Sequence, residues 1–289
     1  MSEQTPPPPY SAFGPESGPV LFTSSHSGRF YPAAMLARSR LPPREIRRAE
    51  DALVDQLLQA ASQSAPVLAA NYARAYVDLN RDPTELDPDM FEPALPALAV
   101  KASERVTVGL GVLPRSIAPG RRIYARPLPS REAAERIAEV HAPWHGIVEA
   151  RLTDAALACG FAVLVDMHSM PSVGGGSGPE LVIGDLHGRS AAPALTGWLR
   201  DWFLRAGYRV ALNAPYAGAY TLERHGRPGR GRHAVQVEID RSLYLDCDRL
   251  APGPGFERIA ADLARLARQL TAVAPTLGLE PPAWAAAAE

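Results

Sequence analysis

The side chains best suited to do chemistry follow an apolar run in the second half of the chain. Residues 161–165 read Phe-Ala-Val-Leu-Val, and Asp166, His168 and Ser169 come directly after them. Such a run predicts a strand that is buried on both faces of a parallel sheet. Because open α/β sheets bind ligands at the carboxyl ends of their strands, we expect these polar residues to belong to a site.

Other predicted strands end in ionisable residues of the same kinds. A predicted strand over 19–24 leads to His26, one over 74–83 carries Asp78 and Arg81, and one over 234–241 carries Glu238 and Arg241. Two histidines, carboxylates and arginines suit a divalent metal that handles an anionic substrate. A hydrolytic zinc site needs three protein ligands and an open position for water. The chain contains no His-Glu-x-x-His helix, so no single local motif carries this interpretation.

Two other kinds of site are weighed against the metal site. Several serines lie near histidines, but no Gly-x-Ser-x-Gly segment joins a strand to a helix, which argues against a Ser-His-Asp hydrolase. The glycine-rich loop at 174–178 lacks the Gly-Lys-Ser/Thr ending and does not lead into a predicted helix. It is therefore not a phosphate-binding loop.

The predicted elements alternate between strands and helices, which indicates an α/β fold with a mixed, mostly parallel sheet flanked by helices. A helix is predicted over 44–63, where Glu50 falls on the apolar stripe and Asp51 lies off it. A second helix is predicted over 131–157, with a kink or break at Pro143. A strand is also expected over 106–112. The loop at 213–232 is long enough to suggest a function.

Residues 1–17 are rich in proline and polar side chains and predict an extended or disordered tail, followed by a single domain over 18–289. The net charge is -1, which gives no reason to expect binding to nucleic acid or to a membrane surface. The chain shows no signal peptide and no apolar run of about 20 residues, so we expect a cytoplasmic protein. Cys159 and Cys247 lie in apolar surroundings and are expected to be buried free thiols.

Seven segments resemble the N-formylglutamate amidohydrolase family, in the expected order and over about 19–270. The family is similar to zinc carboxypeptidases and aspartoacylase, and the resemblance implies a phosphorylase/hydrolase-like, zinc carboxypeptidase-like α/β fold. The segments are HSGRFYP at 26–32, EDALVD at 50–55, VDLNR at 77–81, DMHSMP at 166–171, GD at 184–185, NAPYAG at 213–218 and QVEIDRSLY at 236–244.

The resemblance implies roles for four residues around zinc or another divalent metal. In the larger group, a strand ending in Asp-x-His-Ser carries one metal ligand, which corresponds to His168, and the first strand leads to another, which corresponds to His26. A late strand carries the catalytic base, which corresponds to Glu238. The group's usual ligand three residues after the first histidine is replaced here by Arg29. The family motif favours Asp51 as the acidic ligand, whereas helix phase favours its neighbour Glu50.

The resemblance further implies hydrolysis of N-formyl-L-glutamate to L-glutamate and formate, and its name implies a role in histidine degradation. The two carboxylates of such a substrate need cationic partners, and arginine forms bidentate pairs with them. Asn80 and Arg81 are the first candidates, followed by Arg224 and Arg241. Asp166 has the same strand orientation as His168 and is a candidate to hold an imidazole ring.

Two other functions remain open at this point. One is a zinc-dependent deacylase or carboxypeptidase-type hydrolase that acts on another N-acyl amino acid or a small peptide. The other is a metal-binding or ligand-binding protein that has lost catalysis. The presence of Glu238 argues against the second, because a structural zinc site uses four protein ligands and needs no free base. The expected partner is a small molecule, and the sequence indicates no oligomeric state.

Overall fold

The computed structural model describes residues 5–96, 100–118 and 120–281. Its contacts divide the chain into two compact units. The first comprises Met1–Ser11, Ser25–Ala52 and Ala70–Ile147, and the second comprises Ala12–Ser24, Leu53–Ala69 and Val148–Glu289. The organisation of 18–289 as a single domain stays a prediction.

The second unit is built on a seven-stranded sheet with the strand order β1-β3-β2-β6-β9-β7-β8. From β3 to β9 the strands run parallel, β7 is antiparallel to β9, and β8 is parallel to β7. The predicted mixed, mostly parallel sheet is therefore confirmed. The strands are β1 (Tyr10–Phe13), β2 (Val20–Ser24), β3 (Val67–Ala70), β6 (Ala162–Met170), β7 (Leu181–Gly184), β8 (Val210–Leu212) and β9 (Arg232–Asp240).

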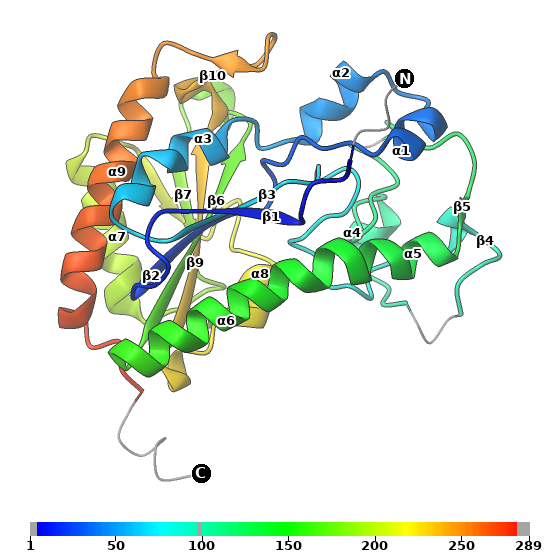
Figure 1. Ribbon diagram of the computed structural model, residues 1–289. Coiled ribbons are helices and arrows are strands. Elements are labelled where there is room, and N and C mark those ends of the chain that lie inside the picture. The colour runs from blue at the N-terminus through cyan, green and yellow to red at the C-terminus, as the bar shows by residue number, and fades with distance from the viewer. Residues whose placement is uncertain (1–4, 97–99, 119, 282–289) are drawn as a thin grey trace. The chain divides into compact units, whose positions relative to one another are not determined.

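Helices cover the faces of this sheet (Figure 1). The helices α7 (Pro193–Arg205) and α9 (Phe256–Val273) lie on one side, where the Trp202 indole donates to Gln269 Oε1 at 2.5 Å. On the other side, Glu149 of α6 (Ala142–Cys159) bonds to His225 of α8 (Tyr220–His225) and to Arg232 of β9. The unit also contains α3 (Val54–Gln59), β10 (Leu245–Asp246) and β11 (Ala251–Pro252).

Strand β6 is the central element of the sheet, and all nine of its residues are buried. Its β-branched and aliphatic side chains can pack on both faces because helices cover both. The sequence places Asp166, His168 and Ser169 where the strand should end, and the pairing with β9 continues to Met170 opposite Asp240. The backbone hydrogen bonds of that ladder keep Asp166 and His168 inside the strand, which fixes their direction more firmly than a loop would.

The first unit consists of shorter elements joined by turns. The strand expected over 74–83 does not form, and these residues make turns, while α4 occupies part of the strand expected over 106–112. The elements are α1 (Ala33–Arg38), α2 (Pro43–Ile46), β4 (Phe91–Glu92), α4 (Glu104–Thr107), β5 (Leu128–Pro129) and α5 (Arg131–Arg136), with β4 parallel to β5.

The helix predicted over 131–157 forms, but it contains a π-helical turn at Ile137–His141 between α5 and α6. Pro143 follows this turn as the second residue of α6. Because proline has no N–H group to bond to the carbonyl four residues earlier, the regular hydrogen-bond pattern cannot continue through it. The predicted interruption at Pro143 thus takes the form of a wider turn.

The N-terminal range predicted as a tail contains a strand. Tyr10–Phe13 forms β1 at the edge of the large sheet, while residues 1–4 lie outside the described residues. Side chains do part of the anchoring, since the Asn71 amide donates to Pro8 O at 2.9 Å and Ser11 Oγ donates to Asn71 Oδ1 at 2.9 Å. An edge position tolerates the prolines before β1, which cannot supply ladder hydrogen bonds.

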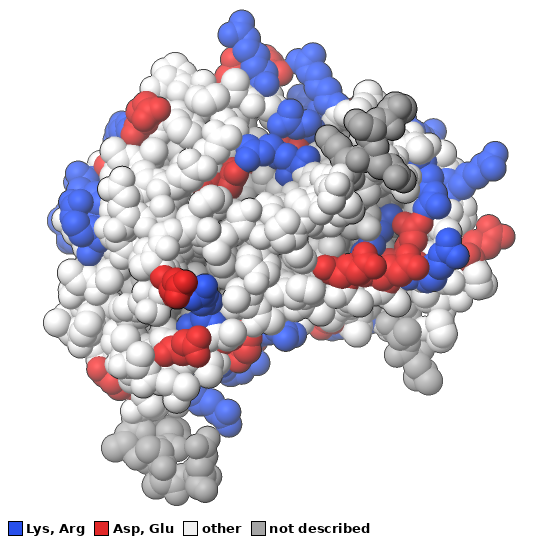
Figure 2. Space-filling view, in the orientation of Figure 1, with Lys and Arg blue, Asp and Glu red and all other residues white. Residues whose placement is uncertain are grey.

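The distribution of charge on the surface agrees with the small net charge of the chain, whereas the exposure of the two cysteines differs from the prediction. Acidic and basic side chains are interspersed on the face drawn in Figure 2. In the part of the chain that the structure describes, no helix is both long and apolar enough to cross a bilayer.

Cys159 and Cys247 are free thiols as expected, but both are exposed, so their predicted burial is wrong. Cys159 is the last residue of α6, and Cys247 directly follows β10.

We expect the free energy of unfolding to fall as the pH is lowered, because two buried histidines are held neutral. Burial lowers the pKa of His225 and His233 below the ordinary value of 6.5. In addition, His233 Nδ1 accepts from the Ala192 N–H, which requires that nitrogen to be unprotonated. Below the ordinary histidine pKa the unfolded chain therefore binds more protons than the native protein, so stability decreases with decreasing pH.

Urea unfolding at about pH 7 and about pH 5.5, with a chelator present in both, measures this loss. The His233→Gln variant should be less stable than the wild type at the higher pH, yet lose less stability on acidification. Equal pH dependence in the two proteins would show that His233 does not titrate in this range.

Candidate functional site

His26 is a buried side chain of the first unit, and an aspartate fixes its orientation. Its Nε2 donates to Asp78 Oδ1 at 2.7 Å, and both side chains are about 2% exposed. Burial by itself raises the pKa of Asp78, but the charges of Arg74 and Arg81 and the hydrogen bond from His26 outweigh it and hold that pKa well below its usual range. Asp78 is therefore a carboxylate that only accepts hydrogen bonds, which leaves the lone pair of the imidazole on Nδ1.

The segment after His26 runs very close to residues 71 and 72. The N–H groups of Arg29 and Phe30 both donate to Asn71 O, at 3.0 and 2.9 Å. A Cβ atom at Gly28 would lie 2.1 Å from Tyr72 O, so only glycine fits there. Tight packing of this segment holds the His26 backbone in place.

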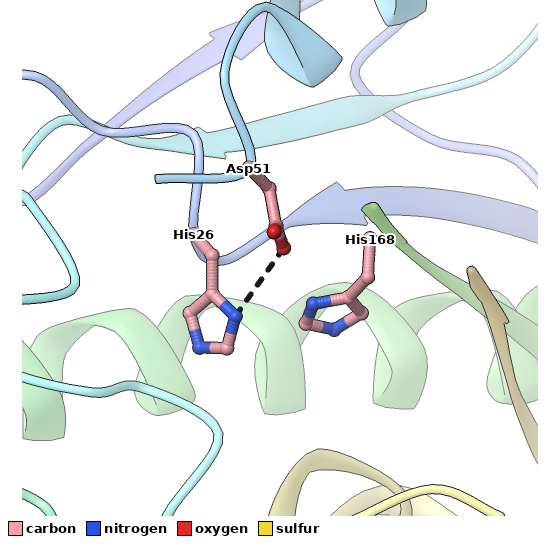
Figure 3. A group of neighbouring side chains, drawn as sticks. All are labelled: His26, Asp51 and His168. Carbon is pink, nitrogen blue, oxygen red and sulfur yellow. Dashed lines mark ion pairs between the residues drawn. The ribbon is translucent and has the colours of Figure 1, made fainter. Parts of the chain in front are cut away.

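Asp51 approaches His26 from another part of the same unit. Asp51 Oδ2 lies 3.4 Å from His26 Nδ1, the pair marked by the dashed line in Figure 3. Their backbones are also linked, because the Asp51 N–H donates to His26 O at 3.0 Å. Figure 3 also draws His168, which lies on β6.

The helix predicted over 44–63 is interrupted at these carboxylates, so the argument from helix phase is wrong. The chain forms α2, the 3-10 helix Arg47–Ala49 and then an extended residue, Glu50, before α3 begins after Leu53. The backbone bond from Asp51 N to His26 O replaces a helical bond at this point. Sequence periodicity cannot reveal a break that depends on a contact 25 residues away in the chain.

Glu50 has different partners from Asp51. It is buried, and it accepts from Tyr31 Oη at 2.7 Å and from Arg47 Nε at 3.0 Å. Burial, together with the Glu50 charge, raises the pKa of Tyr31, so its phenol stays protonated and donates. These contacts compensate the buried Glu50 charge locally, whereas Asp51 is the carboxylate that the structure brings to His26.

His168 is held in the second unit in the same way as His26 in the first. Its Nε2 bonds to Asp166 Oδ2 at 2.8 Å, and Thr23 Oγ1 of β2 donates to Asp166 Oδ1 at 2.7 Å. All three side chains are buried. The bond to the carboxylate on Nε2 again places the ring lone pair on Nδ1, as in the carboxylate–histidine pairs that orient metal ligands. Asp166 thus contacts an imidazole as the sequence suggests, while its functional role stays a prediction.

Glu238 lies opposite His168 on the neighbouring parallel strand. Their Cα atoms are register partners, as are those of Asp166 and Gln236 two residues earlier. Paired residues on adjacent strands point to the same face, so these four side chains share one patch of the sheet. Glu238 is 8% exposed, and Gln236 Nε2 donates to its Oε1 at 2.8 Å. This bond orients the carboxylate predicted to act as the base.

Asn80 and Arg81, the first candidates for substrate binding, are both buried in the turn after Asp78. The Asn80 N–H donates to Asp78 Oδ1 at 2.9 Å. Arg81 donates from Nε to Leu110 O at 3.0 Å and from Nη1 to Asn80 O at 2.7 Å. Burial lowers the pKa of Arg81 to about 10, so it remains a cation at neutral pH. Its bonds to backbone carbonyls show that it helps to shape this turn.

The other two arginines differ in their surroundings. Arg241 follows β9 directly and is half-buried, with Nε donating to Ser169 Oγ at 3.0 Å. This bond holds it at the carboxyl ends of β6 and β9. Arg224 is exposed on α8 and donates to Tyr220 Oη at 3.0 Å. Substrate binding by either residue stays a prediction.

Sequence reasoning predicted no orienting role for three residues that hold these side chains, although it counted Asp78 among the ionisable residues of the predicted site. Asp78 holds His26, Thr23 holds Asp166, and Gln236 holds Glu238. Gln236 and Glu238 lie two positions apart on a strand, so their common face could have indicated a contact. The other two pairs join segments 52 and 143 residues apart, and no local pattern signals them.

Two of the family-like segments shape a loop in the second unit. The Asn213 side chain donates to Asp185 Oδ1 at 2.8 Å and accepts from the Asp185 N–H at 3.0 Å. A Cβ atom on Gly184 would lie 2.6 Å from the carbonyl carbon of Ala217, so glycine is required for this close approach. The segments at 184–185 and 213–218 therefore hold each other in place, and α8 follows within the predicted long loop.

Comparison with known proteins places these residues in a family. The model of the N-formylglutamate amidohydrolase family matches residues 18–245. The N-formylglutamate deformylase of Pseudomonas aeruginosa is 32% identical over 189 residues, which are 63% of this chain and 65% of that protein. The Pseudomonas putida deformylase is 30% identical over the same length and with the same coverage. The match thus spans 65% of the length of these curated relatives.

A solved structure agrees with this result. The crystal structure of an N-formylglutamate amidohydrolase from Ralstonia eutropha has a TM-score of 0.85 and 29% identity to this chain, and the match covers 91% of this chain and 97% of that one. The family match contains every residue described above for the two histidine–aspartate pairs and for Glu238. The resemblance seen in the sequence motifs is confirmed, and the chain belongs to the N-formylglutamate amidohydrolase family.

Proposed function

We propose that this protein is a metal-dependent amidohydrolase that hydrolyses the formyl amide of N-formyl-L-glutamate to L-glutamate and formate. The observation that carries the proposal is the pair of buried histidines, each with Nε2 bonded to an aspartate. This arrangement presents Nδ1 as a ligand atom and is typical of histidines that bind zinc. Family membership supplies the substrate class.

His26, Asp51 and His168 are the ligands that we propose for zinc or another divalent metal. They offer two imidazole nitrogens and one carboxylate oxygen, a donor set that suits such an ion. The 3.4 Å between His26 Nδ1 and Asp51 Oδ2 is longer than a good hydrogen bond. It is close to the separation of about 3.3 Å between two ligands on a tetrahedral ion with bonds of about 2.0 Å. The residues therefore fit a metal.

A bound metal would polarise the amide carbonyl and lower the pKa of a water molecule. Glu238 would accept a proton from the attacking water as its oxygen bonds to the formyl carbon. Glu238 would then deliver that proton to the amide nitrogen as the C–N bond breaks, releasing formate and the amine of glutamate. Gln236 keeps the Glu238 carboxylate in one orientation through both transfers.

Arginines are proposed to bind the two carboxylates of the substrate. Arg241 is the strongest candidate, because Ser169 holds its Nε beside the strand that carries Glu238. Asn80 and Arg81 belong to the turn that holds Asp78, and Arg81 contributes a buried positive charge. Arg224 is exposed on α8 and would act at the edge of the site.

Formate release from N-formyl-L-glutamate tests the proposal directly. Activity should disappear after treatment with a chelator and return on addition of zinc. Activity that survives complete metal removal would refute the metal mechanism. A zinc-loaded protein that leaves N-formyl-L-glutamate intact but cleaves another N-acyl amino acid would refute the proposed substrate.

A further inference from the structure

Two buried histidines of the first unit have no role in the chemistry above. His141 ends the π-helical turn and His145 follows in α6, and their ring centroids lie 4.5 Å apart. His141 Nε2 donates to Arg81 O at 2.9 Å, and His145 Nε2 donates to Leu79 O at 2.8 Å. Both rings therefore bond to the backbone of one short segment.

That segment, Leu79–Arg81, directly follows Asp78. It belongs to neither a strand nor a helix, so no ladder or helical bonds hold its backbone. Instead, its three successive carbonyls accept from side chains, with His145 on Leu79 O, Arg81 Nη1 on Asn80 O and His141 on Arg81 O. A buried carbonyl that loses its hydrogen-bond partner is destabilising, so these bonds favour one conformation of the turn.

The conformation of this turn determines where the Asp78 carboxylate lies. Asp78 Oδ1 accepts from the Asn80 N–H at 2.9 Å and from His26 Nε2 at 2.7 Å. A shift of the 79–81 backbone would move the N–H group that orients Asp78, and with it the partner of His26. Each histidine is thus linked to a proposed metal ligand through three hydrogen bonds and one turn.

A π-helical turn ends at the first of the two histidines. Residues four apart on a regular α-helix differ in direction by about 40°, and here both must reach carbonyls only two residues apart. The π turn at Ile137–His141 widens the helix just before His145 and ends at His141 itself. Such turns often occur at functional sites, and the two imidazoles at and after this one bond to the same backbone segment.

We infer that His141 and His145 are positioning residues that hold the turn after Asp78, so that Asp78 orients His26 for metal binding. The inference rests on the proposed function, because it assumes that His26 is a metal ligand. His141 and His145 act on that site through the turn after Asp78, and they contact neither substrate nor metal.

Zinc affinity measured by competition with a chelator tests this inference without substrate. His145→Leu should weaken zinc binding about tenfold, the lower end of the range for residues that orient ligands. His145→Gln should restore most of the affinity, because its side-chain amide can donate to the same carbonyl. His141→Leu should give a smaller loss, because Arg81 O is three residues from Asp78. Amide exchange over 77–82 should accelerate in both leucine variants.

His233→Leu is a matched control in the second unit. His233 is buried, and its Nε2 also bonds to a backbone carbonyl, Leu279 O, at 2.8 Å. This variant should lose stability comparable to His145→Leu yet keep wild-type zinc affinity. Equal zinc affinity in His145→Leu and His233→Leu, or no recovery in a folded His145→Gln protein, would overturn the inference.

The same measurements separate this inference from the proposed function. A wild-type protein that binds zinc but leaves N-formyl-L-glutamate intact would refute only the substrate, and the variants' zinc affinities would still decide the role of the histidines. A wild-type protein that binds no zinc would overturn the inference together with the metal site.

Discussion

Replacing Glu238 with glutamine is expected to lower kcat for N-formyl-L-glutamate by about a hundredfold to ten-thousandfold, the range for loss of a general base. Glutamine has nearly the same shape and can still accept from Gln236 Nε2 through its amide oxygen. It cannot take a proton from water at neutral pH. Because Glu238 is not a proposed metal ligand, the variant should keep its full metal content.

Steady-state formate release and elemental analysis of the same preparation measure the two quantities together. Glu257→Gln is a suitable control, because this exposed glutamate lies in the first turn of α9, and both rate and metal content should be unchanged. A Glu238→Gln enzyme with full rate and full metal would show that the base is another residue. A variant that loses its metal would show instead that Glu238 is a ligand.

The adjacent carboxylates Glu50 and Asp51 should respond oppositely to replacement by alanine. Asp51→Ala should lose bound metal and reduce activity at least about a hundredfold, because a site with two remaining protein ligands holds zinc poorly. Glu50→Ala should keep its metal but lose stability by about 1–3 kcal/mol, because Tyr31 and Arg47 lose their buried partner.

Metal content after purification and urea unfolding of both variants distinguish these outcomes. Each variant serves as the control for the other, because both remove a buried carboxylate from the same short segment. Loss of metal in Glu50→Ala alone would reverse the assignment and return the ligand to the residue that helix phase favoured. Full metal in both variants would place the acidic ligand elsewhere in the chain.

Much of the fold around the site could be predicted because it depends on local patterns. The apolar run before Asp166 predicted a buried strand, and the residues 234–241 predicted a second strand. These are β6 and β9, which lie side by side in the sheet. Alternation along a strand correctly placed Asp166 on the same face as His168. The family-like segments are also local, and together they identified the family before any contact was known.

The contacts that orient the proposed site came only from the tertiary structure. Asp78 and Thr23 act on histidine or aspartate partners 52 and 143 residues away, and nothing near them in the sequence signals those distances. The choice between Glu50 and Asp51 as the partner of His26 depended on a break in a predicted helix. That break depends on the bond from Asp51 N to His26 O.

Residue types and spacing by themselves predicted the class of sheet and brought His26, His168 and Glu238 forward as candidates, because hydrophobic pattern and motif spacing are properties of short stretches. The tertiary structure decided which nitrogen of each imidazole faces an aspartate, which acid accompanies His26, and which histidines hold the turn after Asp78. Hydrogen bonds have direction and short range. The partners of bonds between distant segments are therefore settled only when those segments pack, whereas the order of apolar and polar residues is already present in the sequence.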